Sequence, residues 1–445
     1  MTGRYKAYSE YKDSGIEWLK DMPSHWELIR AKHLFQRVQR PVRPQDGIVT
    51  AFRDGEVTLR SNRRTDGFTN AAKEIGYQGV RKGDLLVHAM DGFAGAIGIS
   101  DSDGKCSPVC SVCIPRKSHT VDPTYFGYLV RQLAVTDYIT SLAKGIRERS
   151  TEFRFAEFAS LFLAAPPKEE QKKIANFLDH ETAKIDTLIT KQEKLIELLK
   201  EKRQAVISHA VTKGLNPQAP MKDSGVEWLG EVPEHWGVTK LKWKTPTTSG
   251  GTPTTSKYEM YYQGGHIPWI RTTDLNNGKL LETPVSITPK ALADTACSIL
   301  PKNSVLLAMY GGAGSIGKHS LLMFEATINQ AVCGIYPSSA FEPEFLHYFY
   351  EFYRPFWMIN AAGTRKDPNI GQDHIKEGKV VLPPISEQQA IVSHVNKRLA
   401  LLDSLNDKVS DAIELAKERK TALISAAVTG KIDVRDFTLK SGEVN

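Results

Sequence analysis

The sequence predicts a mixed α/β fold, with two globular α/β domains separated by two long antiparallel coiled-coil helices and related by a pseudo-twofold internal repeat. The motif KDSGIEWLKDMPSHW at residues 12–26 returns as KDSGVEWLGEVPEHW at residues 222–236, with ten of fifteen positions identical. Further matches follow at offsets of 217 to 219 residues, so the chain holds two copies of one plan. Each copy ends in a stretch of more than forty residues without proline or glycine, at about 168–213 and 386–428.

The repeated motif is the first element of each copy, and later elements keep the same order. HAMDGFAGAIG, which ends at Gly98, matches LAMYGGAGSIG, which ends at Gly317, and APPKEEQKKI matches LPPISEQQAI. The segments between the first two matches, residues 27–84 and 237–303, are unlike each other. We interpret the repeated frame as scaffold and the divergent filling as the part that sets what each half recognises.

The two long stretches predict amphipathic helices, because apolar residues recur at heptad spacing between Lys and Glu. Gly214 and Gly430 are natural stops, and Ser386 with Gln389 has the spacing of a capping box at the start of the distal helix. We expect the helices to bury their stripes against each other in antiparallel order; parallel packing stays an alternative. The predicted stripe residues are Leu178, Ile185, Gln192, Leu199 and Val206, accompanied by Leu188 and Leu195, and on the distal helix Val395, Leu402, Val409, Ala416 and Leu423.

These observations predict five consecutive segments. They are an N-terminal segment with the first globular domain (1–166), a central long helix (167–215), a linker with the second globular domain (216–383), a distal long helix (384–430) and a tail (431–445).

The composition is that of an ordinary globular chain. Of the 445 residues, 41% are hydrophobic and 24% charged, and no apolar run approaches the length of a membrane span. The first residues have no apolar core of a signal peptide, so we expect a cytoplasmic protein without membrane contact. Five cysteines, an odd number, indicate reduced thiols. The net charge of +7 suits a polyanionic partner without requiring one.

The predicted geometry suits double-stranded DNA. Twofold proteins place equivalent elements on two half-sites at a fixed spacing. Because the two recognition domains differ, the target is expected to be two different short sequences separated by a gap of fixed length.

Several motifs together resemble the specificity subunit of Type I restriction-modification systems. They are KDSGVEWLGEVPEHW, GGTPTTSKYEMYYQGGHIPWIRTTDL, ATINQAV, GTRKDPNI and LPPISEQ. The resemblance implies a non-catalytic subunit that recognises a split DNA site, with spacing set by the helices. It also implies two methyltransferase subunits and restriction–translocase subunits as partners. S-adenosylmethionine, ATP and Mg are then expected in those partners, and no cofactor in this chain.

Two motifs suggest other chemistry. GAGSIGKH fits a phosphate-binding loop except that His319 stands where Ser or Thr should bind magnesium, so we favour a glycine turn between strands. Cys106, Cys110 and Cys113 lack a fourth ligand at a known spacing, so we predict buried thiols and no metal site. A P-loop NTPase and a purely structural scaffold remain the alternative functions.

Candidate DNA contacts lie in basic and amide-rich loops, because Arg and Lys reach guanine or phosphate while Asn reaches adenine. In the first half they are Arg53, Arg60, Asn62, Arg63, Arg64, Arg147 and Arg149. In the second half they are Thr252, Thr255, Lys257, Tyr258, Arg271, Thr272, Thr273, Asn276, Asn277, Arg365, Lys366 and Asn369.

Overall fold

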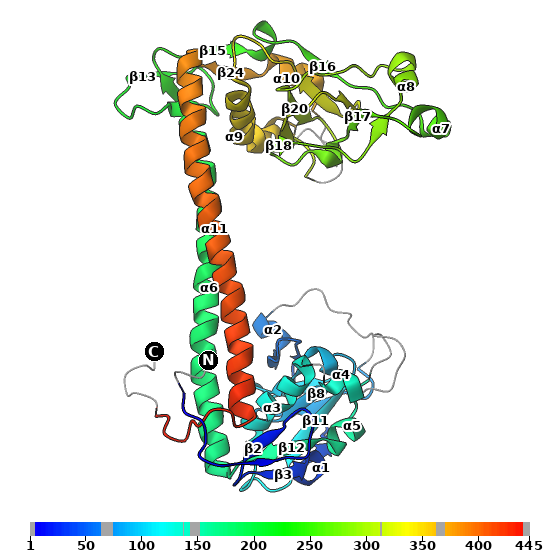
Figure 1. The fold of residues 1–445 in the computed structure, drawn as a ribbon, viewed down its shortest axis with the longest axis vertical. Coiled ribbons are helices and arrows are strands. Elements are labelled where there is room, and N and C mark those ends of the chain that lie inside the picture. The colour runs from blue at the N-terminus through cyan, green and yellow to red at the C-terminus, as the bar shows by residue number, and fades with distance from the viewer. Residues whose placement is uncertain are drawn as a thin grey trace. The chain divides into compact units, whose positions relative to one another are not determined.

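A computed structural model describes residues 5–63, 74–136, 138–142, 152–311, 314–361 and 370–438 (Figure 1). The chain divides into two compact units. Unit 1 comprises residues 1–193 and 411–445, and unit 2 comprises residues 194–410. Both long helices pass from one unit to the other, so each unit contains about half of each helix.

Unit 1 is built around an antiparallel four-stranded sheet of order β4-β11-β8-β9, with the pairs β1–β2, β3–β12, β5–β6 and β7–β10 beside it. Its elements are β1 (Tyr11–Asp13), β2 (Asp21–Pro23), β3 (Glu27–Arg30), α1 (Ala31–Leu34), β4 (Phe35–Val38), β5 (Val49–Ala51), β6 (Val57–Leu59), α2 (Arg60–Arg63), β7 (Gln78–Val80), β8 (Leu85–His88), η1 (Gly92–Ala94), β9 (Ile97–Ile99), β10 (Gly104–Cys106), β11 (Cys110–Pro115), α3 (Pro123–Val135), α4 (Tyr138–Leu142), α5 (Phe155–Ser160), β12 (Phe162–Ala165) and the first part of α6 (Lys168–Lys213).

Unit 2 contains a five-stranded sheet of order β16-β23-β20-β21-β18, in which only β18 and β21 are parallel, and a three-stranded sheet of order β19-β17-β22. Its elements are β13 (Met221–Asp223), β14 (Glu231–Pro233), β15 (Gly237–Lys240), η3 (Leu241–Trp243), β16 (Thr247–Ser249), η4 (Thr255–Lys257), α7 (Tyr258–Tyr261), β17 (Ile267–Ile270), η5 (Thr272–Asp274), β18 (Lys279–Leu280), β19 (Ser286–Ile287), α8 (Pro289–Asp294), β20 (Val305–Ala308), β21 (His319–Leu322), β22 (Thr327–Ile328), β23 (Val332–Ile335), α9 (Pro343–Ala361), α10 (Gln372–Glu377), β24 (Lys379–Leu382) and the first part of α11 (Ile385–Val428).

The frame repeats in structure as it does in sequence. In unit 1, β1 pairs with β2 and β3 pairs with β12; in unit 2, β13 pairs with β14 and β15 pairs with β24. All four pairs are antiparallel, and β12 and β24 each lead directly into a long helix. The mixed α/β class with an internal repeat is therefore confirmed.

The long helices run antiparallel within each unit. In unit 1, Lys420 of α11 binds Asp186 of α6 at 2.7 Å. The hydroxyl of Tyr125 donates to the carbonyl of Ala164 in β12, just before α6 begins, and to the carbonyl of Val428, where α11 ends, at 3.0 and 3.3 Å. In unit 2, Arg203 of α6 binds Asp403 of α11 at 3.0 Å. The antiparallel prediction is confirmed, and the parallel alternative is excluded.

The apolar stripe on α6 differs in part from the prediction. Leu178 and Ile185 are buried and Gln192, Leu199 and Val206 are half-buried, but Leu188 and Leu195 are 47% and 40% exposed. The heptad partners that turn inward are instead Thr182, Ile189, Ile196, Arg203 and Ala210. The pairing of Leu188 and Leu195 with the stripe was wrong, because each lies one residue before an inward-turned position, Ile189 or Ile196, and so about 100° away from it around the helix.

The start of α11 also corrects the sequence analysis. The helix begins at Ile385, and the backbone N–H groups of Glu387 and Gln388 donate to the carbonyl of Pro384 at 2.9 and 3.0 Å. Ser386 lies inside the first turn, so the proposed capping box with Gln389 is wrong; a proline, whose fixed φ suits a helix start, precedes the helix instead.

Each unit has its own apolar core, in which the repeated motif takes part. Trp26, Phe35, Tyr125 and Phe126 fill the core of unit 1 together with Leu178 of α6. The core of unit 2 contains Trp236, Phe345 and Val395, among many others.

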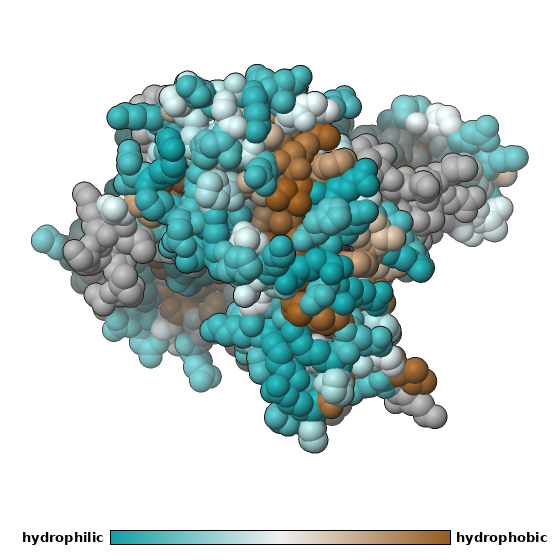
Figure 2. All heavy atoms as spheres, turned by 90° about the horizontal axis from the view of Figure 1, so that it is seen from below, coloured by the Kyte–Doolittle hydropathy of each residue, from teal (hydrophilic) through white to brown (hydrophobic). Residues whose placement is uncertain are grey.

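Hydrophilic side chains cover most of the face shown in Figure 2, with smaller hydrophobic areas between them. Among the described residues, no helix has the length and apolar character needed to cross a membrane.

Candidate nucleic-acid interface

The His–Trp pair at the end of the repeated motif attaches each recognition domain to a long helix. In unit 1, the indole N–H of Trp26 donates to Glu170 of α6 at 2.9 Å, and His25 Nε2 lies 2.8 Å from the same carboxylate. In unit 2, Trp236 and His235 contact Glu387 of α11 at 3.1 and 2.8 Å. The repeated motif is therefore a structural anchor, which leaves the divergent filling to bind a ligand.

The glutamine after each anchoring glutamate makes a second repeated contact. The side-chain amide of Gln171 accepts from the N–H of Asp122 at 2.7 Å and donates to the carbonyl of Pro166 at 2.8 Å. Gln388 accepts from Glu342 and donates to Pro383 at 2.9 Å in both cases. A buried glutamine is favourable only when its side-chain amide is hydrogen-bonded. These contacts of Gln171 and Gln388 therefore hold the start of α6 against the start of α3, and the start of α11 against the start of α9.

The two helix ends occupy equivalent places beside the two copies of the motif. Gly214 and Gly430 have φ of +75° and +70°, the left-handed conformation that ends a helix. A Cβ on Gly214 would lie 3.2 Å from Trp236, and a Cβ on Gly430 would lie 3.2 Å from Trp26. In unit 1, the end of α11 thus has the position that the end of α6 has in unit 2.

The structure brings four candidates of the first half together on the β5–β6 hairpin and α2. Arg53 is 69% exposed and bonds to Asp91 at 2.7 Å, and Arg60 donates to Thr50 at 2.9 Å. Asn62 donates to Thr58 at 2.9 Å. Arg63 is held by Asp54 and Glu56 and lies over the Phe52 ring at 4.3 Å. These carboxylates partly neutralise the positive charge of the hairpin, and the side chains of Arg53 and Asn62 are exposed.

The segment GGTPTTSKY is held rigidly and presents its polar residues outward. The carbonyl of Gly251 accepts from the Trp269 indole at 3.0 Å, and the carbonyl of Pro253 accepts from the Tyr262 hydroxyl at 2.5 Å. A side chain on Gly250 would overlap the carbonyl of Ile328, so only glycine permits this approach to β22. Four of the predicted contacts follow in this exposed run, namely Thr252, Thr255, Lys257 and Tyr258.

Tyr258 is the most accessible aromatic candidate. Its ring is 61% exposed and stacks on Tyr262 with a centroid distance of 5.4 Å and an interplanar angle of 15°. Lys257 lies beside it, with Nζ 5.4 Å from the Tyr261 centroid. A basic and aromatic surface of this kind can contact phosphate and sugar at once.

The remaining candidates of the described second half lie around η5 and the following turn. Arg271 makes a two-point contact with Asp274, at 3.2 and 3.1 Å, and Thr272 and Thr273 follow it in η5. Asn276 accepts from Ser320 Oγ at 3.0 Å, and Asn277, with a φ of 58°, accepts from the backbone N–H of His319 at 3.2 Å. The two asparagines shape a turn, which leaves less of their amides available to read a base.

Six candidates lie outside the described residues. They are Arg64, Arg147, Arg149, Arg365, Lys366 and Asn369.

Trp243 is an exposed aromatic residue that the sequence analysis missed. It is 65% exposed and has Lys240 Nζ 5.7 Å from its ring centroid. Lys240 and Lys242 both bind Glu377, and these hydrogen bonds lower the pKa of that carboxyl to about 2. The alternation KLKWK at residues 240–244 was the available signal, because basic residues next to an exposed aromatic side chain are typical of surfaces that bind nucleic acid.

The described part of the motif GAGSIGKH, residues 314–319, leads into β21, which pairs antiparallel with β20. The N–H of Gly317 donates to the carbonyl of Ala308 at 3.0 Å, as expected for the glycine turn between strands that the sequence favoured. A phosphate-binding loop must instead lead into a helix. The geometry therefore gives no support to the P-loop alternative.

The cysteines are buried and reduced, as predicted. Cys106 lies in β10, and Cys110 and Cys113 lie in β11. A hydrogen bond with Cys106 and burial raise the pKa of Cys110 well above its ordinary value, and burial raises the pKa of Cys113 to about 12. These thiols are packing residues.

Comparison with known proteins gives one consistent family. The family model "Type I restriction modification DNA specificity domain" matches residues 233–415. The Type I restriction enzyme MjaVIII specificity subunit of Methanocaldococcus jannaschii is 26% identical over 96% of this chain and 98% of its own length. The EcoBI specificity subunit of Escherichia coli is 26% identical over 78% of this chain and 73% of its own.

Two solved structures share the fold. The HsdS subunit from Thermoanaerobacter tengcongensis aligns over 92% of this chain and 98% of that chain, with a TM-score of 0.56 and 16% identity. A chain from a study of complex assembly and conformational transition of the type I R-M system aligns over 92% and 99%, with a TM-score of 0.69 and 15% identity. The chain is thus similar over most of its length to Type I restriction enzyme specificity subunits, and the specificity-domain model matches residues 233–415.

Proposed function

We propose that this chain is the non-catalytic subunit that recognises a split site on double-stranded DNA for a Type I restriction-modification complex. The observation that carries the proposal is that both units repeat the same anchor, a His–Trp pair on a glutamate, while the segments between the repeated motifs differ. His25–Trp26 and His235–Trp236 attach to their helices in the same way, whereas the filling is a β5–β6 hairpin in one unit and the β17–β19–β22 region in the other. Two different surfaces on one scaffold fit two different half-sites.

The polar groups are distributed as DNA recognition requires. Exposed Arg53 and Asn62 lie on the first filling, and exposed Thr252, Lys257 and Tyr258 lie on the second. Most of them would contact phosphate and position the domain, and a few would reach base edges. The long helices would set the length of the gap between the half-sites.

Exposed leucines on the long helices support the expected protein partners. In unit 2, Leu195, Leu198, Leu401 and Leu405 are 40 to 55% exposed. Leucines at this density on a helical surface favour a protein interface. We assign this surface to methyltransferase subunits, two per complex, with restriction–translocase subunits joining them.

The proposed complex divides the chemistry among its subunits. S-adenosylmethionine, ATP and Mg would be bound by the partners, and the complex would act in the cytoplasm.

The decisive experiment exchanges one filling. Residues 27–165 are replaced by those of a relative with a known target, and the methylated motif of cells that express the complex is sequenced. We expect one half of the motif to change while the other half and the gap stay the same. An unchanged motif, with the chimera assembled normally, would favour a purely structural scaffold and refute the proposal.

A further inference from the structure

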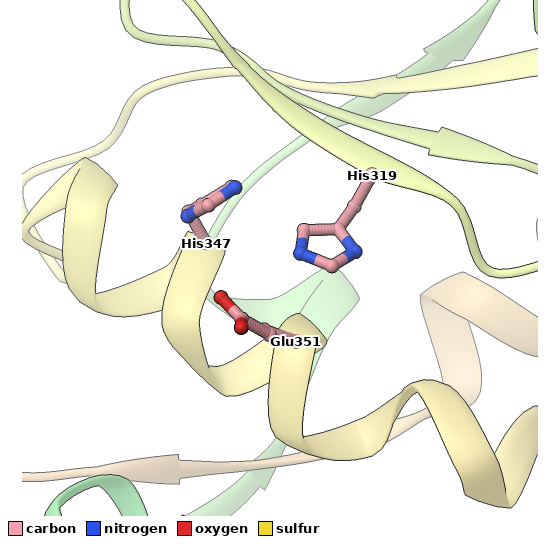
Figure 3. A group of neighbouring side chains, drawn as sticks. All are labelled: His319, His347 and Glu351. Atoms are coloured by element: carbon pink, nitrogen blue, oxygen red, sulfur yellow. The ribbon is translucent and has the colours of Figure 1, made fainter. Parts of the chain in front are cut away.

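Three side chains of unit 2, two buried and one half-buried, converge in a way that the proposed function does not explain. His319 begins β21, and His347 and Glu351 lie one turn apart on α9, with the three side chains turned toward one another (Figure 3). One potential ligand atom from each residue lies within 4.8 Å of the other two. His319 and His347 are 0% and 4% exposed.

The atoms that face this centre are unpaired. Nε2 of His319, Nε2 of His347 and Oε2 of Glu351 are buried and have no hydrogen-bond partner among the described residues. A buried polar atom without a partner costs free energy, so three at one point call for a ligand that satisfies all of them.

The surroundings prepare the three groups as ligands. His319 Nδ1 lies 3.3 Å from the carbonyl of Gly317, to which it can donate, so that Nε2 keeps its lone pair. Arg203 Nε lies 4.0 Å from Oε1 of Glu351, the other carboxylate oxygen, and Arg203 also binds Asp403. The inner oxygen, Oε2, therefore remains available.

The expected protonation states agree with this geometry. Burial lowers the pKa of His319 to about 4 and lowers that of His347 well below its ordinary value. Burial raises the pKa of Glu351.

We propose that His319, His347 and Glu351 form a structural site for a divalent transition-metal ion, best suited to Zn²⁺. Two imidazoles and one carboxylate are ligands that zinc accepts, and a water molecule would complete its tetrahedral coordination. Bonds of about 2.0–2.2 Å would draw the three ligand atoms closer together. The ion would tie β21 and the adjoining glycine turn to α9.

The site belongs to the second copy alone. Helices α3 and α9 both begin with a proline, Pro123 and Pro343, and counting from these puts Gly127 and Arg131 where α9 has His347 and Glu351. The repeated frame folds in unit 1 without these two ligands. The cluster is therefore a feature added to unit 2 rather than a requirement of the common scaffold.

The test measures metal in the purified full chain. The protein is prepared without a metal-affinity tag, its metal content is determined, and the chelated protein is titrated with Zn²⁺ and with Co²⁺ as a spectroscopic probe. We expect binding of about one ion per chain, tetrahedral Co²⁺ absorption bands and a higher melting temperature with Zn²⁺. Glu351→Gln and His347→Gln should each weaken Zn²⁺ binding more than about 100-fold, since even outer-shell partners contribute about 10–100-fold.

His119→Gln, which removes an exposed histidine of unit 1, is the control and should bind Zn²⁺ normally. Failure of the wild-type chain to take up Zn²⁺ would overturn the proposal and identify the cluster as a neutral hydrogen-bonding group. Unchanged Zn²⁺ binding in both variants would likewise overturn it, by placing the ion elsewhere. The readouts do not depend on DNA recognition, so failure here leaves the proposed function standing.

Discussion

At the scale of single residues, the glutamate that contacts the repeated His–Trp pair is more buried and has more hydrogen-bond partners in unit 1 than in unit 2. The side chain of Glu170 is 6% exposed and accepts from Tyr8 at 2.6 Å as well as from Trp26. Glu387 is 26% exposed and contacts only His235 and Trp236 among the described side chains. The same anchor is therefore expected to differ in strength between the two copies.

Glu170→Ala should lower the free energy of unfolding of unit 1 by about 3 kcal/mol, because it leaves two buried donors without an acceptor. Glu387→Ala should cost unit 2 about 1–2 kcal/mol, because water can replace part of its contacts. Hydrogen exchange of amides in each unit during urea unfolding measures both values. Equal losses would contradict this difference in burial.

The contact of Glu377 with Lys240 and Lys242 predicts a pH dependence. The lysines lower the pKa of Glu377 to about 2 in the folded chain, whereas an unfolded glutamate titrates near its ordinary value of about 4.3. The folded state then gains stability from the ionised carboxylate above pH of about 4, and loses it as the pH falls toward 2. Glu377 is exposed, so the effect on stability is small.

An NMR titration of the carboxyl carbon should give the low pKa directly. Lys242→Ala should move the pKa of Glu377 upward, and Lys244→Ala, which changes a neighbouring lysine outside the contact, should not. A Glu377 pKa that is the same in wild type and Lys242→Ala would show that the lysine contact does not form in solution.

At the scale of elements, the exposed leucines of α6 and α11 are expected to carry the partner interface. Leu198→Glu and Leu405→Glu should weaken association with the methyltransferase subunit by tenfold or more, about 1.4 kcal/mol or above, because each places a charge in an apolar interface. Pull-down at graded concentrations measures the loss. Leu281→Glu is the control, since Leu281 is 74% exposed in the recognition part of unit 2. Equal binding by all three variants would rule out this surface.

The elements also show what could be predicted from sequence. The long helices and the glycine turn followed from periodicity and from Gly and Pro positions, which are local signals. Leu188 and Leu195 were misassigned because an apolar residue on the outer edge of a helix looks the same in sequence as one on the seam. The role of Asn276 and Asn277 in a turn depends on contacts with β21, more than forty residues away, which the sequence does not reveal.

The cluster of His319, His347 and Glu351 was missed for the same reason. The spacing of His347 and Glu351 by four residues places them on one helix face, and that was a usable signal. The third member comes from a strand that only the tertiary fold brings alongside, so the sequence analysis predicted no metal site.

At the scale of the whole molecule, the chain closes on itself in unit 1. The N–H of Asp433 donates to the carbonyl of Lys6 at 2.7 Å, and the hydroxyl of Tyr11 donates to the carbonyl of Gly430 at 2.9 Å. The segment that follows α11 thus lies beside the segment that precedes the first motif. In unit 2, the chain itself connects the end of α6, at Gly214, to the second motif. In unit 1, the end of α11 reaches the first motif through noncovalent contacts instead.

This closure predicts that the chain tolerates circular permutation. A permutant that begins at Asn216 and joins the original ends by a short Gly-Ser linker should assemble normally and direct methylation of the same motif. Sequencing of methylated DNA from cells that express the permutant checks this. A permutant cut at Gly98, inside the four-stranded sheet, is the control and should not fold; failure of both would contradict the closure.

The repeated anchor has a consequence for how such a gene can change. Because both copies of the fifteen-residue motif dock on a glutamate in the same way, either anchor can accept a filling that came with the other. Crossing-over between the repeated stretches, or between two alleles at these stretches, would exchange one recognition filling and leave every anchor intact. A lineage could then acquire a new combination of half-sites in a single genetic event, without waiting for compensating mutations in the rest of the enzyme.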